Sequence, residues 1–111
     1  MKAIPLLAAA AAVLAFSVPA SAAVDADAAN KIVKEDGCTK CHSVDKDKKG
    51  PSFKKTAAKY KGKADAEAKL VTFLTTGPKV KMDDGTEEEH KQVKAKDPAQ
   101  VKNLVQWILS Q

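Results

Sequence analysis

Apolar residues recur along the second half of this chain at intervals of three and four, which is the spacing of one face of an α-helix. The clearest run lies near the C-terminus, where Asp97-Pro98 supplies a capping residue followed by proline at the first helical position. The apolar residues that share its inward face are Val101, Leu104, Val105 and Ile108, with Trp107 close to that face. The sequence therefore predicts an amphipathic C-terminal helix.

Three shorter helical segments precede it, each bounded by a capping or helix-breaking residue. Their expected bounds are Asp25 or Asp27 to Gly37, Phe53 to Tyr60 between the Gly50-Pro51 turn and Gly62, and Asp65 to Gly77-Pro78. The apolar residues on one side are Ala28, Ala29, Ile32 and Val33 in the first, and Leu70, Phe73 and Leu74 in the third. No segment alternates over a length that would make a strand, so the prediction is an all-α fold.

The first 22 residues have the pattern of a secretory signal peptide. Lys2 precedes a mostly apolar run from Ala3 to Val18, and Ala20-Ser21-Ala22 is typical of a cleavage site. The run is shorter than the roughly 20 residues that span a bilayer, and a membrane anchor is the alternative. We expect residues 1–22 to be removed and residues 23–111 to form a single domain in the periplasm, with no membrane span in the mature chain.

The composition of the expected mature chain limits its partners and its core. The whole chain has a formal net charge of +5, and removal of Lys2 with the leader leaves +4. Its basic residues are all lysines, and recognition of nucleic acid favours arginine forks and stacking aromatics, so we expect no nucleic acid partner. Four aromatic residues, Phe53, Tyr60, Phe73 and Trp107, are little material for the core of a small domain.

The most specific chemistry lies in Cys38-Thr39-Lys40-Cys41-His42. Two cysteines separated by two residues and followed by histidine are the pattern of covalent haem attachment, with both sulfurs in thioether bonds and His42 on the iron. A zinc site would need a second pair of ligands, and His90 is the only other cysteine or histidine. A thioredoxin-like site would need a preceding strand. A plain disulfide between Cys38 and Cys41 is the remaining alternative.

The order of these features resembles that of class I c-type cytochromes: a helix, the CxxCH motif, Gly50-Pro51, a middle helix, a loop and a terminal helix with Trp107. The resemblance implies a small cytochrome c fold of three to five short helices around one covalently attached haem c. It also implies that the first and last helices cross and that Trp107 packs on the haem. In that family the carbonyl of the proline accepts a hydrogen bond from the iron-binding histidine, a role open to Pro51, although a simple turn is as good an interpretation.

The second axial ligand is less determined, because both His90 and Met82 precede the last helix. Related cytochromes usually place a methionine about sixteen residues before the tryptophan of the last helix. His90 lies 17 residues before Trp107 and Met82 lies 25 before it, so we favour His90, with Met82 as the alternative and an open site as a third possibility. Thr86 and Glu89 have the spacing of a capping box, which predicts a helical turn just before His90.

The predicted function is electron transfer, without enzymatic activity, by a monomeric shuttle in a respiratory, metal or anion redox chain. Lysines near the motif are expected to steer a redox protein with an acidic face, although a merely solvated face is the alternative: Lys40, Lys46, Lys48, Lys49, Lys54 and Lys55. The other candidate function is a gas-sensing or peroxidase-like haem protein. It requires an open or displaceable sixth position on the iron.

Overall fold

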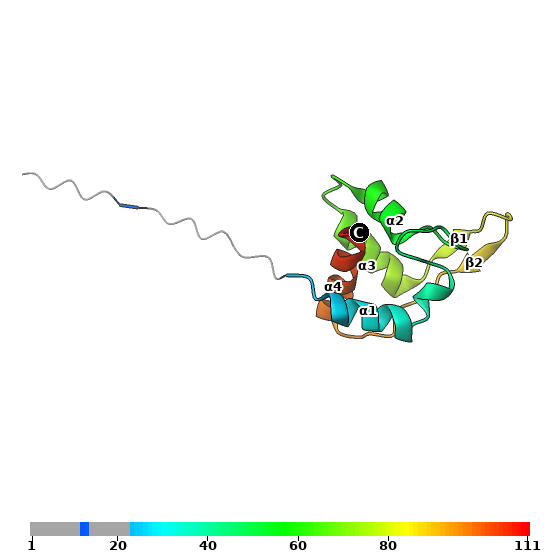
Figure 1. Ribbon diagram of the computed structural model, residues 1–111, viewed down its shortest axis with the longest axis horizontal. Coiled ribbons are helices and arrows are strands. Elements are labelled where there is room, and N and C mark those ends of the chain that lie inside the picture. The colour runs from blue at the N-terminus through cyan, green and yellow to red at the C-terminus, as the bar shows by residue number, and fades with distance from the viewer. Residues whose placement is uncertain (1–11, 14–22) are drawn as a thin grey trace, which may run out of the picture.

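The computed structural model describes residues 12–13 and 23–111. The described chain folds into short helices and one small hairpin, in the order α1 (Ala26–Glu35), the 3-10 turn η1 (Cys38–Lys40), α2 (Phe53–Tyr60), α3 (Ala66–Thr76), β1 (Lys79–Lys81), β2 (Glu87–Glu89) and α4 (Pro98–Leu109) (Figure 1). The predicted signal peptide, apart from Ala12 and Val13, lies outside the described residues. Among the residues that are described, no helix has the length and apolar character needed to cross a membrane.

Most helices begin where capping residues predicted them. The Asp25 carboxylate accepts a hydrogen bond from a backbone N–H in the first turn of α1 at 3.0 Å. Asp97 caps α4 in the same way at 2.9 Å, and Pro98 occupies the first helical position. Asp65 occupies the N-cap position of α3 as predicted, but its carboxylate makes no cap hydrogen bond and instead pairs with Lys69, one turn further along α3, at 3.0 Å.

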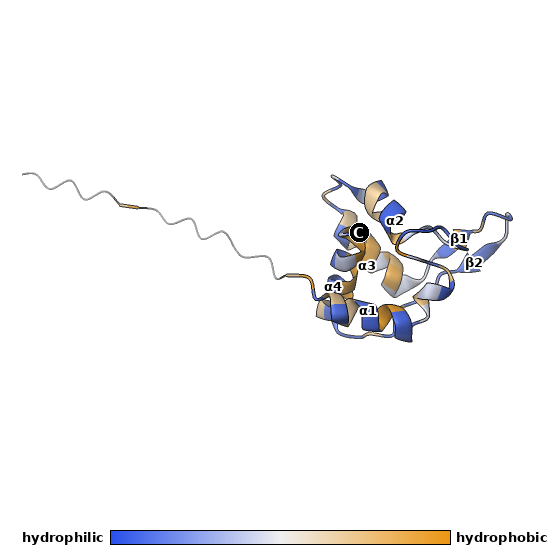
Figure 2. Cartoon of the chain, viewed as in Figure 1, coloured by the Kyte–Doolittle hydropathy of each residue, from blue (hydrophilic) through white to orange (hydrophobic). Residues whose placement is uncertain are grey.

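Helices α1 and α4 pack against each other, and their contact forms the centre of the core. The buried residues of this cluster are Ala29, Val33, Phe53, Leu104, Trp107 and Ile108, with Ile32 packed beside them. Figure 2 shows the apolar residues gathered on the helices and polar residues over the hairpin. The predicted crossing of the first and last helices and the predicted inward face of α4 are therefore confirmed.

The β1–β2 hairpin corrects the prediction that the chain contains no strand. Its strands pair antiparallel, with Lys79 opposite Glu89 and Lys81 opposite Glu87. Each strand has three residues, which is too short for a period of two to stand out in the sequence. The fold as a whole is still predominantly helical, as predicted.

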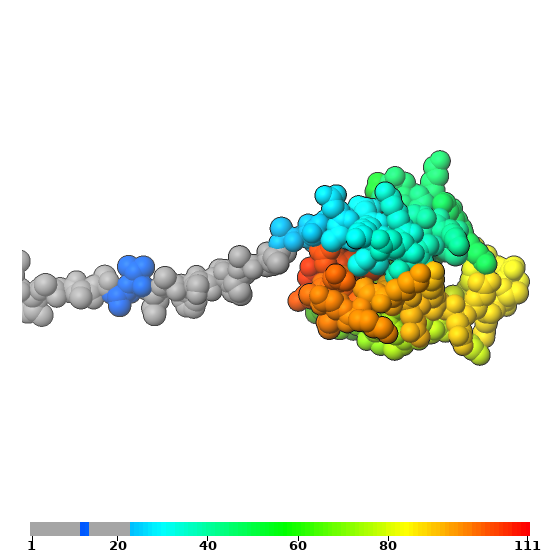
Figure 3. All heavy atoms as spheres, turned by 90° about the horizontal axis from the view of Figure 1, so that it is seen from below, coloured from blue at the N-terminus to red at the C-terminus, as the bar shows by residue number. Residues whose placement is uncertain are grey.

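The predicted capping box at Thr86 and Glu89 is also wrong. The Thr86 hydroxyl donates to the Asp84 carboxylate at 2.6 Å and closes the hairpin turn, while Glu89 lies in β2. The Gly85 N–H donates to the Met82 carbonyl across the same turn at 3.0 Å. The hairpin projects from the helical body in Figure 1, and Figure 3 shows an opening between it, in yellow, and the green segment above it.

Candidate functional site

The CxxCH motif lies on a single tight turn that follows α1. The 3-10 turn η1 starts after Gly37, and the His42 N–H donates to the Cys38 carbonyl at 2.9 Å. Both Cys38 and Cys41 are free and half-buried, so the structure contains no disulfide between them. Two free thiols and an imidazole are thus held together on one turn.

The environment of Cys38 differs from that of a reactive redox thiol. Burial, followed by the nearby charge of Asp36, raises the pKa of Cys38. Thiol oxidoreductases need a lowered pKa, because the thiolate is the nucleophile. Across the described residues, no group of three or more histidine, cysteine, aspartate or glutamate side chains could hold a metal ion. Neither thiol exchange nor zinc binding is favoured.

The loop after the motif fixes the ring of His42. Its Nδ1 lies 2.7 Å from the Pro51 carbonyl oxygen, and a carbonyl can only accept, so Nδ1 carries the proton. This leaves Nε2 unprotonated and available to a metal. Gly50 packs against the same ring, because a Cβ at this position would lie 2.5 Å from His42 Cε1. The position therefore has no room for any side chain.

Aromatic residues pack against His42 and restrict its ring. The Phe53 ring stacks on His42 with 5.4 Å between ring centroids, and Trp107 meets Phe53 edge-on at 5.4 Å. Trp107 thus reaches His42 through Phe53. Sequence reasoning did not assign Phe53 to the site, although it is the first residue of the helix that follows Pro51.

His90 directly follows β2 and is held by its backbone as well as its ring. Its N–H donates to the Pro78 carbonyl at 2.9 Å, and its Nδ1 lies 2.9 Å from the Lys91 carbonyl. Because the Lys91 carbonyl can only accept, Nδ1 of His90 carries the proton, and its Nε2 is unprotonated. Burial is the main cause that lowers the pKa of His90, which keeps the imidazole neutral and able to bind a metal.

Two further residues shape the surroundings of His90. Phe73 packs edge-on against the imidazole at 4.8 Å, a contact that sequence reasoning did not anticipate. Gly77 ends α3 at a φ of 59°, and a Cβ there would press on the His90 carbonyl oxygen. Only glycine combines this φ with so close an approach.

The structure brings the imidazoles of His42 and His90 close together. Their ring centroids are 6.1 Å apart and the rings are tilted by 42°. Met82 lies at the turn end of the hairpin, where its N–H donates to the Thr86 carbonyl at 2.7 Å, whereas His90 follows the base of the hairpin.

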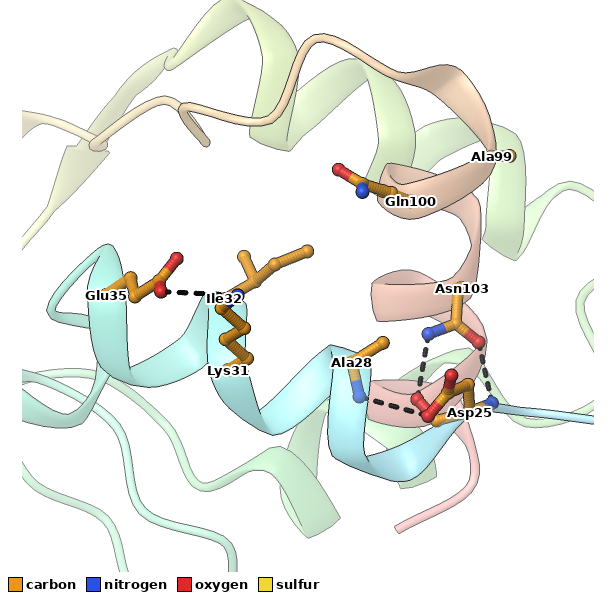
Figure 4. A pocket seen from close by; sticks show the side chains of 8 residues that line it. All are labelled: Asp25, Ala28, Lys31, Ile32, Glu35, Ala99, Gln100 and Asn103. Carbon is orange, nitrogen blue, oxygen red and sulfur yellow. Dashed lines mark hydrogen bonds and ion pairs between the residues drawn. The ribbon is translucent and has the colours of Figure 1, made fainter.

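A groove between α1 and α4 lies elsewhere and has different chemistry. Figure 4 shows Asn103 joined to the backbone of Asp25 by two hydrogen bonds, each of 2.8 Å, and Lys31 paired with Glu35 further along α1. The groove is lined by Asp25, Ala28, Lys31, Ile32, Glu35, Ala99, Gln100 and Asn103. It contains neither a thiol nor an imidazole and is not a candidate for haem attachment.

Residues 26–111 match the sequence model of the family described as Cytochrome c. This chain belongs to the cytochrome c family. It is 38% identical over 78 residues to cytochrome c-551 of Allochromatium vinosum, which covers 70% of this chain and 80% of that protein. It is 35% identical over 80 residues to cytochrome c-551 of Pseudomonas aeruginosa, which covers 72% of this chain and 73% of that protein.

Solved cytochromes share the fold. The class 1 cytochrome MtoD from Sideroxydans lithotrophicus ES-1 superimposes with a TM-score of 0.77 at 60% identity, over 79% of this chain and 97% of MtoD. Wild-type cytochrome c552 of Nitrosomonas europaea gives a TM-score of 0.60 at 30% identity, over 73% of this chain and 96% of that one. The chain is an electron-transfer cytochrome with one covalently bound haem c, as the motif predicted.

The residues of this cytochrome fit an iron held between two imidazoles. An imidazole nitrogen bound to a metal lies about 2 Å from it, and the ring centre lies about 1 Å beyond that nitrogen. The centres of two imidazoles on opposite sides of one metal are therefore about 6 Å apart. The observed separation of 6.1 Å agrees with this requirement. Both Nδ1 atoms are engaged by backbone carbonyls, which leaves both Nε2 atoms for the metal.

Proposed function

We propose that this cytochrome is a periplasmic one-electron carrier in which Cys38 and Cys41 hold the haem and His42 and His90 are the two axial ligands. The observation that carries the proposal is the pair of neighbouring imidazoles, with ring centroids 6.1 Å apart and each Nδ1 hydrogen-bonded to a backbone carbonyl. When bound, the haem supplies an Fe(II)/Fe(III) couple. The remaining task of the chain is to hold both imidazoles in place and to admit a partner.

On the near side, Pro51 orients the ligand. Its carbonyl fixes the tautomer of His42 and increases the basicity of Nε2, as outer hydrogen bonds to metal-binding histidines do. Phe53 stacks on the imidazole and Trp107 packs edge-on against Phe53, so two buried rings restrict the movement of this ligand. We infer that Trp107 also packs on the haem, as the resemblance implied.

On the far side, His90 takes the position that methionine has in most members of the family. A second imidazole gives a lower reduction potential than a methionine sulfur, other things being equal. With both axial positions filled by the chain, no substrate reaches the metal, so we expect no enzymatic activity. The ligand-binding alternative needs an open or displaceable position and is disfavoured for the same reason. Met82 remains the alternative ligand.

The proposed partner is another redox protein with an acidic face. Three of the lysines near the motif already have carboxylate partners, because Lys49, Lys54 and Lys55 pair with Glu88, Asp45 and Asp47. Within the described residues, Lys40, Lys46 and Lys48 make no ion pair. The side chains of Lys40 and Lys91 both lie beside Gly37, next to Cys38. We infer that the lysines near the motif without an ion pair, which are Lys40, Lys46 and Lys48 in the described part of the chain, provide the positive charge that docks the partner.

Export completes the proposal. We expect cleavage after Ala22 to release residues 23–111 as a single domain, working as a monomer in the periplasm. The cytochromes c-551 it resembles come from bacteria, which is consistent with this location. Sequencing the N-terminus of the secreted holoprotein tests it, with Ala23 as the expected first residue.

The ligand assignment is tested by two matched variants, His90→Ala and Met82→Ala. In the ferrous state, His90→Ala should bind carbon monoxide rapidly, because the sixth position has lost its imidazole. Met82→Ala should react as slowly as the wild type. Rapid binding confined to Met82→Ala would transfer the ligand role to the methionine, and rapid binding by the wild type would favour the ligand-binding function.

A further inference from the structure

We propose that the ion pair between Lys49 and Glu88 is a clasp that keeps His90 on the iron and so sets how readily this cytochrome admits an outside ligand. The inference rests on the proposed role of His90. It assigns a positioning role to two residues that belong neither to the CxxCH motif nor to the ligand pair.

The clasp connects the two segments that carry His42 and His90. Lys49 Nζ lies 3.0 Å and 3.3 Å from the two carboxylate oxygens of Glu88. Lys49 adjoins Gly50, which packs directly against the ring of His42. Glu88 lies two residues before His90. The pair therefore bridges the proximal loop and the hairpin without passing through the metal.

The hairpin has few other ties to the body. Within residues 23–111, the Lys49–Glu88 pair is the only hydrogen-bonded or ionic contact between residues 79–89 and the rest of the chain. The next anchors lie at its base, where His90 bonds to Pro78 and Val93 bonds to Leu74. Releasing the clasp would leave the hairpin with hydrogen bonds to the body only at the end that bears His90.

The register of the hairpin separates Glu88 from its neighbours. Glu88 pairs with Val80, which is half-buried, whereas Glu87 and Glu89 pair with Lys81 and Lys79. Because successive side chains of a strand point to opposite faces, Glu88 shares a face with Val80, and Glu87 and Glu89 share the other. Glu87 therefore provides a matched control, with the same charge on the same strand and no contact with Lys49.

The solvent exposure of the Lys49–Glu88 ion pair limits how much it can slow the dissociation of His90. The side chains of Lys49 and Glu88 are 54% and 51% exposed. Exposed ion pairs of this kind shift an equilibrium by up to about fivefold, and salt weakens them. The clasp should therefore slow the dissociation of His90 from the iron only modestly, because the bond between His90 and the iron supplies most of the restraint.

The test is the rate at which the ferrous holoprotein binds carbon monoxide at low ionic strength. In Glu88→Gln this rate should rise by roughly twofold to fivefold, while in Glu87→Gln it should equal that of the wild type. Raising the salt concentration should speed the wild type and leave Glu88→Gln unchanged. The exchanged double variant Lys49→Glu/Glu88→Lys should return the rate toward the wild-type value, which distinguishes the ion pair from a general loosening of the hairpin.

These measurements distinguish failure of the clasp from failure of His90 as the iron ligand. Equal rates for Glu88→Gln and Glu87→Gln would overturn the clasp while leaving His90 as ligand. If His90→Ala itself binds carbon monoxide no faster than the wild type, the ligand assignment fails. Failure of the exchanged variant to recover, with an unchanged thermal unfolding midpoint, would also count against the clasp.

Discussion

The ring centroids of His42 and His90 lie 6.1 Å apart, although the two residues come from different loops. Each ring is fixed by a backbone carbonyl, that of Pro51 for His42 and that of Lys91 for His90. Two independent segments of the backbone therefore orient the two rings that meet at this site. Orientation of this kind reduces the rearrangement that accompanies a change of iron charge, which is what an electron carrier requires.

Replacement of Gly50 by alanine should disturb the proximal side. The added Cβ would lie 2.5 Å from Cε1 and 2.9 Å from Nδ1 of His42, so the ring must move away from Pro51. We expect a loss of about 1–3 kcal/mol in the free energy of unfolding, which is the usual effect of overpacking. The visible absorption of the haem should shift as well.

Gly62→Ala is the control for Gly50→Ala. No atom lies within 4 Å of a Cβ at Gly62, but its φ of 77° makes alanine strained there. It should lower stability by about 1–2 kcal/mol and leave the haem spectrum unchanged. A Gly50→Ala protein with the spectrum and stability of the wild type would contradict the described packing of His42.

Exchange of His90 for methionine should raise the reduction potential. Axial ligands set haem potentials over roughly 0.8 V, and methionine favours the ferrous state more than a second imidazole does. We expect the reduction potential of His90→Met to be higher than that of the wild type by on the order of 0.1 V, measured by protein-film or solution voltammetry. Met82→Leu should leave the potential unchanged. The opposite pattern would assign the ligand role to Met82.

Removal of both attachment sites should unfold much of the domain. The core cluster contains only a few buried residues, and the haem is expected to supply the missing apolar mass. Cys38→Ser/Cys41→Ser should therefore be secreted without haem and show weak helical circular dichroism. His90→Ala, which retains both thioethers, should keep its haem and its helices. A haem-free double variant with full helical content would show that the polypeptide core is sufficient.

Docking on an acidic surface should depend on some lysines more than others. Lys54 is already paired with Asp45 at 2.5 Å, whereas Lys40 makes no ion pair in the described part of the chain. Lys40→Glu should weaken adsorption to a carboxylate-terminated electrode at low salt more than Lys54→Glu, although both change the net charge equally. The difference should disappear at high ionic strength. Equal losses would indicate net charge alone rather than a docking site.

The helices and the haem motif could be predicted from the sequence because both depend on local spacing. The face of α4, the bounds of α2 and the pattern from Cys38 to His42 each occupy a few consecutive turns. Capping was less reliable, because the Asp65 carboxylate pairs with Lys69 instead of making a cap hydrogen bond to α3. A carboxylate near a helix start has more than one partner within reach.

The hairpin was missed although a signal was present. Asp84-Gly85 between short segments is a turn sequence, but Thr86 and Glu89 also match a capping box, and the two patterns compete over the same residues. The contacts of Phe53 with His42 and of Phe73 with His90 join segments far apart along the chain. The Lys49–Glu88 pair does the same. Such contacts depend on tertiary packing, which no local spacing specifies.

The most direct test of the account is the axial ligation of the ferric wild-type holoprotein, measured by near-infrared and electron paramagnetic resonance spectroscopy. The close approach of the His42 and His90 rings predicts the signature of a low-spin iron with two imidazole ligands. A methionine–iron signature, or a high-spin iron with an open sixth position, would contradict it.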